Sequence, residues 1–252
     1  MVDHFESKVV LITGGNSGIG QATALAFAKK RANVIVAARR VSEGKATVAM
    51  IKETGGEAHF VETDVTKATE VEALIAACIT NYGGLDYAVN NAGIGGTPFI
   101  PAAEYEEDIW DNVIDVNLKA VWLCMKYEIP EMLKRGQGAI VNMSSVGGLK
   151  GGKMGVAYHA SKHGVIGLSK AAAVEYAARG LRINAICPAT IKTPMTDPYF
   201  HGKDMTAKVS AKYPIGRIGR PEEVASTILW LCSEDASFVT GHAHPVDGGL
   251  LA

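Results

Sequence analysis

The sequence has few of the features that mark membrane, secreted or nucleic-acid-binding proteins. None of its apolar runs approaches the roughly 18 residues that a membrane-spanning helix needs. The segment Met1–Lys8 contains two acids and no apolar stretch, so we expect no signal peptide. Lys and Arg total 25 against 26 Asp and Glu, a net charge of -1. This balance argues against a nucleic-acid partner, because such proteins carry a basic excess or a basic stripe.

Cysteine is scarce as well. Four cysteines lie far apart in the chain and form no C-x-x-C pair, so we expect free, buried thiols and a reducing, cytoplasmic compartment. We expect no metal site, because zinc needs three or four ligands and the sequence offers only scattered histidine pairs. A chain of 252 residues buries roughly three quarters of its unfolded surface and needs no disulfide or metal ion to stabilise its fold.

Short apolar runs alternate with longer helical patterns along the whole chain. Runs rich in β-branched residues are typical of strands buried on both faces of a parallel sheet. The alternation predicts an α/β fold, with helices on both faces of a doubly wound, mostly parallel sheet of seven strands. The predicted strands are Val9–Ile12, Val34–Ala37, Ala58–Val61, Leu85–Val89, Ala139–Met143, Arg182–Cys187 and His244–Val246.

One domain spanning residues 1–252 is expected, because no linker or low-complexity segment interrupts this pattern. The one long stretch without periodicity covers residues 188–213 and is rich in Thr, Pro, Met and aromatic residues. Long loops inside compact domains commonly close over a site. We therefore predict that residues 188–213 form a substrate lid.

A glycine-rich loop follows the first predicted strand directly. It reads Thr13-Gly14-Gly15-Asn16-Ser17-Gly18-Ile19-Gly20 and leads into the helical pattern Gln21–Lys30. Glycines at 14, 18 and 20 permit a tight turn and a close approach of the backbone to a pyrophosphate. The N–H groups and positive end of the next helix then bind the phosphates. Placed between a strand and a helix, the loop predicts a dinucleotide site in a Rossmann fold, although a glycine-rich turn alone is weak evidence.

The spacing T-G-x-x-x-G-x-G resembles that of the classical short-chain dehydrogenase/reductase family, and later motifs extend the resemblance over essentially the whole chain. Asp64-Val65 follows the third strand, where the family holds adenine. Asn90-Asn91-Ala92-Gly93 matches the family's N-N-A-G sequence. Residues 188–193 match its P-G-x-x-x-T pattern except for Ala189. The resemblance implies that the Ile191 backbone and the Thr193 hydroxyl hold the nicotinamide carboxamide.

The expected cofactor-binding residues come from these motifs and from two arginines after the second strand. They are Gly14, Asn16, Ser17, Gly18, Ile19, Gly20, Arg39, Arg40, Asp64, Val65, Asn91, Ala92, Gly93, Tyr158, Lys162, Pro188, Ile191 and Thr193.

Tyr158-His159-Ala160-Ser161-Lys162 opens a strongly helical segment. Residues four apart share one helix face, so the Tyr158 hydroxyl and the Lys162 ammonium can point into one cleft. A neighbouring cation favours the phenolate, which suits a group that exchanges a proton during carbonyl reduction or alcohol oxidation. Y-x-x-x-K alone is a weak motif. The motif becomes stronger evidence because Ser145 lies thirteen residues before Tyr158, and this is the spacing at which the family carries its catalytic serine.

By the same resemblance, the Ser145 hydroxyl would bind the substrate oxygen. Asn117 lies inside the predicted helix Glu107–Leu133, although a short amide is a poor helix former. The family's fourth catalytic residue is an asparagine in such a context, where it holds a water that relays protons from the lysine. The expected catalytic residues are therefore Asn117, Ser145, Tyr158 and Lys162.

The residues at the end of the second predicted strand indicate which nicotinamide cofactor the protein uses. NAD-dependent members of this fold place an acid there to accept from the ribose 2′-OH. Here the segment reads Ala37-Ala38-Arg39-Arg40, without an acid. We expect NADP(H), with Arg39 as the main contact of the 2′-phosphate and Arg40 as a minor one. NAD(H) stays open, because both arginines could be solvated and Asn16 stands where some NADP-using relatives carry a basic residue.

The expected function is an NAD(P)-dependent oxidoreductase that interconverts a secondary alcohol and a ketone, with Tyr158 as general acid and base. A catalytically silent dinucleotide sensor is one alternative, although it would be expected to lack Ser145, Tyr158 or Lys162. A sugar-nucleotide epimerase or dehydratase is another, although those resemble longer chains with a different glycine spacing.

The substrate is expected to be a mostly apolar or aromatic carbonyl compound. The candidate pocket residues are Ile94, Phe99, Val146–Leu149, Met195, Tyr199, Phe200 and Met205. A homotetramer is expected by resemblance, and because the helical patterns Ile109–Leu133 and Ala157–Ala178 carry broad apolar surfaces.

Overall fold

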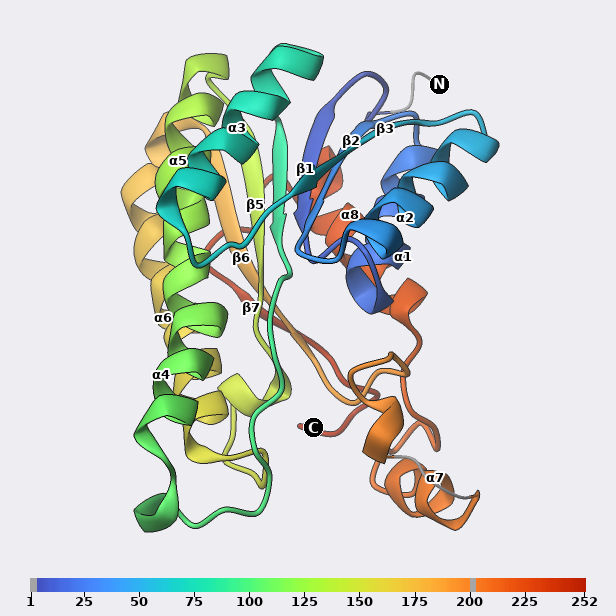
Figure 1. The fold of residues 1–252 in the computed structure, drawn as a ribbon, viewed down its shortest axis with the longest axis vertical. Coiled ribbons are helices and arrows are strands. Elements are labelled where there is room, and N and C mark those ends of the chain that lie inside the picture. Colours follow the sequence, from blue (N-terminus) through green and yellow to red (C-terminus); the bar gives the residue numbers. More distant parts are fainter. Residues whose placement is uncertain (1–3, 200–202) are drawn as a thin grey trace.

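The computed structural model describes residues 4–199 and 203–252, and its strands form a single sheet (Figure 1). The strand order is β3-β2-β1-β4-β5-β6-β7, and every neighbouring pair is parallel. The chain therefore winds outward in one direction from β1 and in the other from β4, which confirms the predicted doubly wound sheet. The strands are β1 (Val9–Thr13), β2 (Asn33–Ala38), β3 (Glu57–Glu62), β4 (Tyr87–Asn90), β5 (Gly138–Met143), β6 (Leu181–Pro188) and β7 (Ala243–Val246).

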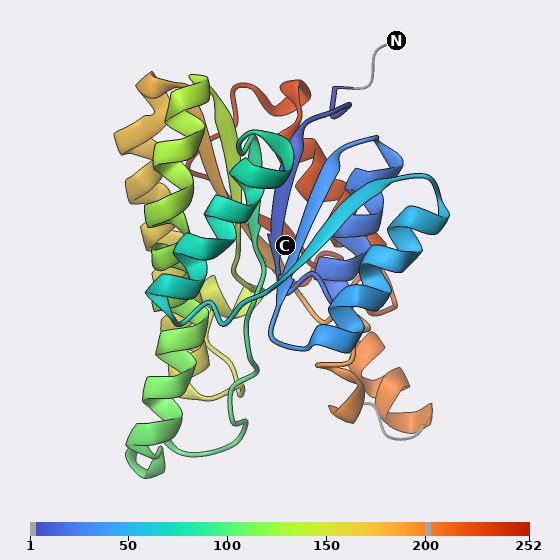
Figure 2. The same ribbon diagram turned by 45° about the horizontal axis from the view of Figure 1, so that its top comes forward.

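Helices cover both faces of the sheet (Figures 1 and 2). One layer holds α1 (Gly18–Lys29), α2 (Val41–Glu53) and α8 (Pro221–Cys232). The other holds α3 (Ala68–Tyr82), α4 (Glu107–Ile114), α5 (Ala120–Arg135) and α6 (Val156–Tyr176). None of the described helices is long and apolar enough to cross a membrane.

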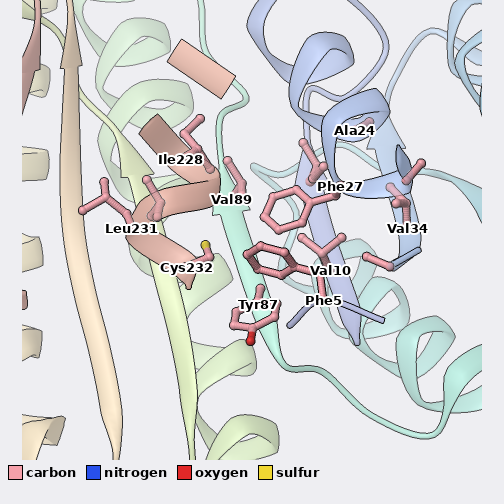
Figure 3. Close-up of a cluster of buried hydrophobic side chains, with 14 of the residues drawn as sticks. Phe5, Val10, Ala24, Phe27, Val34, Tyr87, Val89, Ile228, Leu231 and Cys232 are labelled. Carbon is pink, nitrogen blue, oxygen red and sulfur yellow. The ribbon is translucent and has the colours of Figure 1, made fainter. Parts of the chain in front are cut away.

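The core on each face follows from the two-residue period of the strands. In β1, Val10 packs into the cluster with α1 and α8, whereas Leu11 packs into the cluster with α3, α5 and α6. Figure 3 shows the first cluster, in which the rings of Phe5 and Phe27 meet edge to face with centroids 5.2 Å apart. Because both faces of the central strands are covered, their sequences read as continuous apolar runs.

Three predicted boundaries are wrong in part. The helix predicted over Glu107–Leu133 is interrupted by a π-helical segment, Asp115–Lys119, which carries Asn117. The predicted strand Leu85–Val89 begins only at Tyr87. The stretch predicted as irregular contains a short 3₁₀ turn and α7 (Lys203–Ser210), which protrudes beyond the carboxyl edge of the sheet in Figure 1. Phe200, a predicted pocket residue, lies outside the described residues.

A buried polar network lies between the centre of the sheet and the α5–α6 layer. Asn90 Nδ2 donates to Glu128 Oε2 and to Asn142 Oδ1, each at 3.0 Å, and Asn142 Nδ2 donates to Ser169 Oγ at 3.0 Å. Burial raises the pKa of Glu128 from its ordinary 4.5 to about 8, against the opposing effect of the Asn90 hydrogen bond. Glu128 is therefore a neutral acid in the core at neutral pH.

Replacing Glu128 with glutamine should change how stability depends on pH. The folded chain keeps the Glu128 proton up to about pH 8, whereas an unperturbed glutamate releases it near 4.5. The stabilisation from that proton is complete below the unfolded pKa and is lost as pH rises toward the folded one. The wild-type free energy of unfolding should thus fall by up to about 1.4 kcal/mol per pH unit in this window.

Glu128→Gln should lack this contribution. In urea unfolding measured from about pH 5 to about pH 8, the free energy of unfolding of the variant should therefore rise relative to that of wild type as pH rises. The matched control is Glu131→Gln on the same helix, because Glu131 forms a surface pair with Lys134. The difference between Glu131→Gln and wild type should stay constant over this range. A constant difference for Glu128→Gln as well would contradict the assignment of a buried neutral acid.

Candidate active site

A cleft of about 560 Å³ lies at the carboxyl ends of the central strands, where the winding direction of the sheet reverses. Doubly wound folds bind their ligands at this position. Nearly all predicted catalytic and cofactor-binding residues line it; Gly20 and Asn117 do not and are described separately below. Of the predicted substrate-pocket residues, Ile94 and Met195 line the cleft, whereas Phe99, Val146–Leu149 and Met205 do not, so that part of the prediction is wrong. The predicted residues that line the cleft are Gly14, Asn16, Ser17, Gly18, Ile19, Arg39, Arg40, Asp64, Val65, Asn91, Ala92, Gly93, Ser145, Tyr158, Lys162, Pro188, Ile191 and Thr193.

The glycine loop leaves room for a phosphate group at the start of α1. Gly14 and Gly18 have φ values of 64° and 55°, the left-handed region that favours glycine. A Cβ on Gly14 would lie 2.9 Å from Asn91 Nδ2, and one on Gly20 would clash with the Gly14 carbonyl. The Ser17 side chain makes no capping hydrogen bond to the helix. The helix start therefore suits a pyrophosphate, and the residues present fit a dinucleotide.

Thr13 holds the glycine loop against the loop that follows β4. Its Oγ1 accepts hydrogen bonds from the backbone N–H groups of Asn91 at 3.0 Å and Ala92 at 3.1 Å. Asn91 Nδ2 in turn donates to the Thr13 carbonyl at 3.0 Å. Thr13 was not among the predicted site residues, although it is the first residue of the glycine motif. These three bonds fix the floor of the cleft.

Asp64 lies beyond the carboxyl end of β3, at the side of the cleft where adenine was expected. Its Oδ1 accepts from the Thr66 hydroxyl at 2.8 Å and from the Thr66 N–H at 3.1 Å. Partial burial would raise the pKa of Asp64, but these hydrogen bonds and the charges of Arg39 and Lys67 together lower it. The side chain is therefore an ionised acceptor at neutral pH.

Arg39 and Arg40 follow β2 but differ in their contacts. Arg40 Nη2 donates to Ser17 Oγ at 3.1 Å, and its Nε lies 3.3 Å from Glu43 Oε1. With the Asn16 amide oriented to satisfy its hydrogen bonds, its oxygen accepts from Arg40 Nε at 3.0 Å and Nη2 at 2.9 Å. Arg39 is exposed and lines the cleft on the side of Asp64. The guanidinium of Arg40 is therefore fixed over the glycine loop.

Tyr158 and Lys162 share one face of the first turns of α6. The Lys162 side chain is buried, and its Nζ donates to the Met143 carbonyl at 2.9 Å. The same nitrogen lies 5.8 Å from the centroid of the Tyr158 ring. Burial lowers the pKa of Lys162 from 10.5 to about 8. This amine remains largely protonated at neutral pH, yet releases a proton far more readily than a surface lysine.

Two serines follow β5 and have different partners. Ser144 is buried, and its hydroxyl donates to the Lys162 carbonyl at 2.8 Å. Ser145 Oγ accepts from the Gly147 N–H at 3.0 Å, and its contact to the Pro188 carbonyl is long, at 3.5 Å. Ser144 therefore joins β5 to α6, whereas the hydroxyl of Ser145 is able to donate into the cleft.

Asn117 lies behind the wall of the cleft and is buried. Its Oδ1 accepts from the Ile94 N–H at 2.8 Å, and its Nδ2 donates to the Ile94 carbonyl at 2.9 Å. The side-chain amide is thus used to fix the loop after β4.

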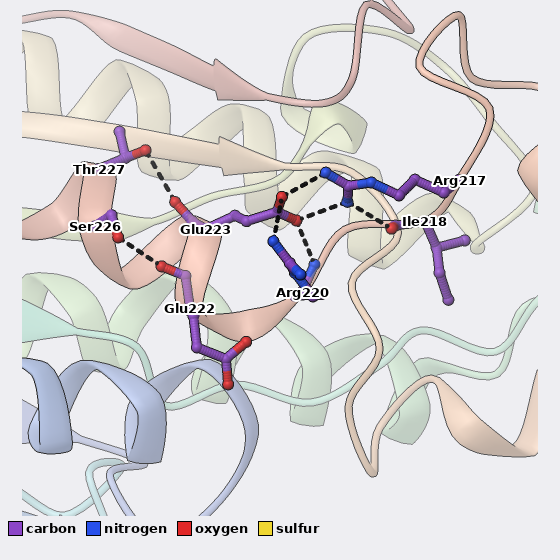
Figure 4. Close-up of polar contacts among 7 residues, drawn as sticks. All are labelled: Arg217, Ile218, Arg220, Glu222, Glu223, Ser226 and Thr227. Atoms are coloured by element: carbon purple, nitrogen blue, oxygen red, sulfur yellow. Dashed lines mark hydrogen bonds and ion pairs between the residues drawn. The ribbon is translucent and has the colours of Figure 1, made fainter.

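An ion-pair cluster anchors the chain where it returns from the region of α7 (Figure 4). Arg217 donates twice to Glu223, at 2.9 and 2.6 Å, and the Arg220 N–H donates to Glu223 Oε2 at 2.8 Å. The hydrogen bonds from Arg217 lower the pKa of Glu223 to about 2. The Tyr213 hydroxyl also donates to Thr190 Oγ1 at 2.6 Å. No sequence motif indicated these anchors, which hold both ends of the segment that carries Ile191 and Thr193.

The chain is similar to known proteins over essentially its whole length. The family described as "Enoyl-(Acyl carrier protein) reductase" matches residues 14–251. The chain is 42% identical over 252 residues to a cyclohexanol dehydrogenase of Acinetobacter sp. (strain SE19), covering 100% of this chain and 98% of the relative. It is also 42% identical over 253 residues to a cis-4-hydroxycyclohexanecarboxylate dehydrogenase of Sinomonas cyclohexanicum, with 100% of both chains covered.

Among solved structures, a variant of actinorhodin polyketide ketoreductase with NADPH matches with a TM-score of 0.92 and 37% identity, over 99% of each chain. These relatives confirm the predicted oxidoreductase class, which acts on CH–OH groups with a nicotinamide dinucleotide. They do not favour the sensor or epimerase alternatives. The chain belongs to the classical short-chain dehydrogenase/reductase family.

Proposed function

We propose that this protein interconverts a secondary alcohol and a ketone in the cleft described above, with Tyr158 as general acid and base. The observation that carries the proposal is that Ser145, Tyr158 and Lys162 line the same cleft as the glycine loop. A bound nicotinamide dinucleotide would supply or accept the hydride. The side chains of this protein orient the substrate and move the proton.

Each catalytic side chain has a separate role in this proposal. Ser145 donates a hydrogen bond to the substrate oxygen and stabilises the charge that develops on it. Tyr158 gives a proton to that oxygen in reduction and removes it in oxidation. Lys162 favours the phenolate, and its lowered pKa suits a group that passes protons onward. A water held at Asn117 would continue the relay, with the Asn117 amide bound to the backbone of Ile94 in the loop after β4.

The residues predicted to bind the cofactor also have separate roles in this proposal. The glycine loop and the start of α1 would hold the pyrophosphate, and Asp64 with the Val65 backbone would hold adenine. The Ile191 backbone and the Thr193 hydroxyl, which also line the cleft, would hold the nicotinamide carboxamide. We propose NADP(H) as the preferred cofactor, because the end of β2 has two arginines and no acid that would repel a 2′-phosphate.

For the substrate we propose a mostly apolar cyclic alcohol or ketone of moderate size. Two relatives are named for alcohols on a six-membered carbon ring. In this chain Ile94, Val116 and Met195 add apolar surface to the cleft. Residues 188–213 would act as the lid of a single catalytic domain spanning residues 1–252, since both ends of this segment are anchored and Met195 is half exposed.

We further propose a cytoplasmic homotetramer. Trp110 on α4, Trp122 on α5 and Val174 on α6 expose 37%, 46% and 84% of their surfaces. Apolar surface on three neighbouring helices supports a contact with further copies of the chain. The cysteines at 78, 124, 187 and 232 are all free and buried, which accords with a reducing compartment.

Tyr158→Phe should abolish turnover and leave nucleotide binding nearly intact, because it removes only the hydroxyl that exchanges the proton. General acid–base catalysis contributes roughly 10²- to 10⁴-fold, and the loss in kcat should fall in this range. Initial rates with cyclohexanone and an open-chain ketone of equal carbon number, together with fluorescence titration of the nucleotide, measure both effects. In wild type, kcat/KM should be higher for the ring compound.

The companion variant Lys162→Ala should impair both rate and nucleotide binding, because it removes the cation and a ribose contact. Tyr158→Phe with a rate close to that of wild type would show that another group transfers the proton. Equal kcat/KM for the ring and open-chain ketones would contradict the substrate proposal alone.

The preference for NADPH should depend on the arginines after β2. A charge-assisted hydrogen bond is worth about 1.5–3 kcal/mol, so wild type should favour NADPH over NADH by roughly 10- to 150-fold in kcat/KM. Ala38→Asp combined with Arg39→Leu should reverse this preference. Arg39→Leu alone should reduce it more than Arg40→Leu alone. A wild type that favours NADH, or an unchanged preference in the double variant, would overturn the assignment.

Static light scattering at micromolar concentration should give four times the mass of one chain. Trp122→Glu should yield smaller species, because it places a charge within the proposed contact. Met50→Glu on α2 is the matched control, since Met50 is 43% exposed but lies in the other helical layer. A wild-type monomer, or a tetramer unaffected by Trp122→Glu, would contradict this surface as the interface.

A further inference from the structure

His159, directly after Tyr158, forms a bridge to the loop that follows Ser145. Its Nδ1 lies 2.8 Å from the Gly147 carbonyl and 3.1 Å from the Lys150 carbonyl. Both partners only accept, so Nδ1 carries the hydrogen and donates to them. Nε2 is buried without a partner among the described residues. A Cβ on Gly152 would lie 3.1 Å from this nitrogen, so the loop covers it closely.

Gly147 connects this histidine to Ser145. Its N–H donates to Ser145 Oγ at 3.0 Å, while its carbonyl accepts from His159. A Cβ on Gly147 would lie 3.2 Å from Tyr158 Cε1 and 3.3 Å from His159 Cε1. The turn Val146–Gly148 is therefore held against the first turn of α6 by a hydrogen bond and by direct packing on two rings.

This arrangement also determines what the Ser145 hydroxyl can do. Its oxygen already accepts the Gly147 N–H, so its own hydrogen remains for donation. The Pro188 carbonyl lies 3.5 Å away, at the outer limit of a hydrogen bond. A substrate carbonyl oxygen in the cleft would be the better acceptor. A shift of Gly147 would remove the constraint that keeps this hydroxyl a donor toward the substrate.

We propose that His159 is a positioning residue for the reaction. It acts through Gly147 and keeps the Ser145 hydroxyl at a fixed place beside Tyr158. The inference rests on the proposed function, because it assumes that Ser145 binds the substrate oxygen. His159 touches neither substrate nor cofactor in this role. It acts with a hydrogen on Nδ1, because both carbonyls at this nitrogen can only accept.

Three variants separate this role from simple packing. His159→Leu keeps bulk but removes the donor, and kcat should fall roughly 10- to 100-fold while nucleotide affinity is unchanged. His159→Asn offers Nδ2 at about the place of Nδ1 and should restore most of the rate. His163→Leu is the control, because His163 is exposed one turn along α6 and, among the residues that the structure describes, its Nδ1 bonds only to the His159 carbonyl. It should leave kcat unchanged.

The link through Ser145 has its own test. In a Ser145→Ala background, His159→Leu should cost little further rate, because residues that act as a unit are not additive. A His159→Leu loss that persists undiminished in that background, or a His159→Asn variant as slow as His159→Leu, would overturn the inference. If Tyr158→Phe and Ser145→Ala lose activity as expected, such a result leaves the proposed function intact. An active Tyr158→Phe would instead refute the proposed function.

A readout independent of turnover covers a variant that fails to fold. ¹⁵N spectra of the holoenzyme with labelled histidine should show one residue, absent from His159→Asn, that has a hydrogen on Nδ1. A His159 signal with its hydrogen on Nε2 would overturn the proposal, since that tautomer cannot donate to Gly147. Thermal unfolding of each variant with bound NADPH shows whether it is folded when assayed.

Discussion

The burial of the Lys162 ammonium is the constraint around which the active site is organised. A buried cation is costly unless it is hydrogen-bonded, and the Met143 carbonyl at the end of β5 meets this need at 2.9 Å. The neighbouring Ser144 hydroxyl binds the Lys162 carbonyl, so α6 is joined to β5 through both its backbone and its amine. Ser145 and Tyr158 project from these joined elements. Their relative position is therefore fixed by the same contacts that satisfy the lysine.

The two halves of the cleft differ in how they are held. On the glycine-loop side, Thr13 and Asn91 connect β1 to the loop after β4 through hydrogen bonds between side chain and main chain, which leaves little freedom for the loop that would hold a pyrophosphate. On the substrate side loops form part of the wall, and Met195 in one of them is 50% exposed. A rigid cofactor half and an adaptable substrate half suit a family in which one reaction is applied to many alcohols.

The sequence predicted the sheet well because its strands are buried on both faces and read as continuous apolar runs. The sequence also predicted that Tyr158 and Lys162 share one helix face, because a spacing of four residues on a helix is a local property. The π-helical segment around Asn117 could not be predicted from the sequence, because it accompanies a pair of hydrogen bonds between Asn117 and Ile94, which are 23 residues apart. Glu128 on α5 lies in the core, where Asn90 at the end of β4 donates to its carboxyl. Contacts distant in sequence leave no periodic signal.

The position of Arg40 bears on the cofactor argument in a way that the sequence could not reveal. Asn16 carries no charge, and its place in the glycine loop therefore counted against NADP(H). In the folded chain, however, its oxygen accepts from two nitrogens of Arg40, and Ser17 accepts from the same guanidinium. A positive charge thus lies over the loop although no residue of the loop carries one. Glu43 neutralises part of it at 3.3 Å, so the field felt by a 2′-phosphate depends on how Arg40 divides its contacts between Glu43 and the ligand, with Arg39 exposed beside it.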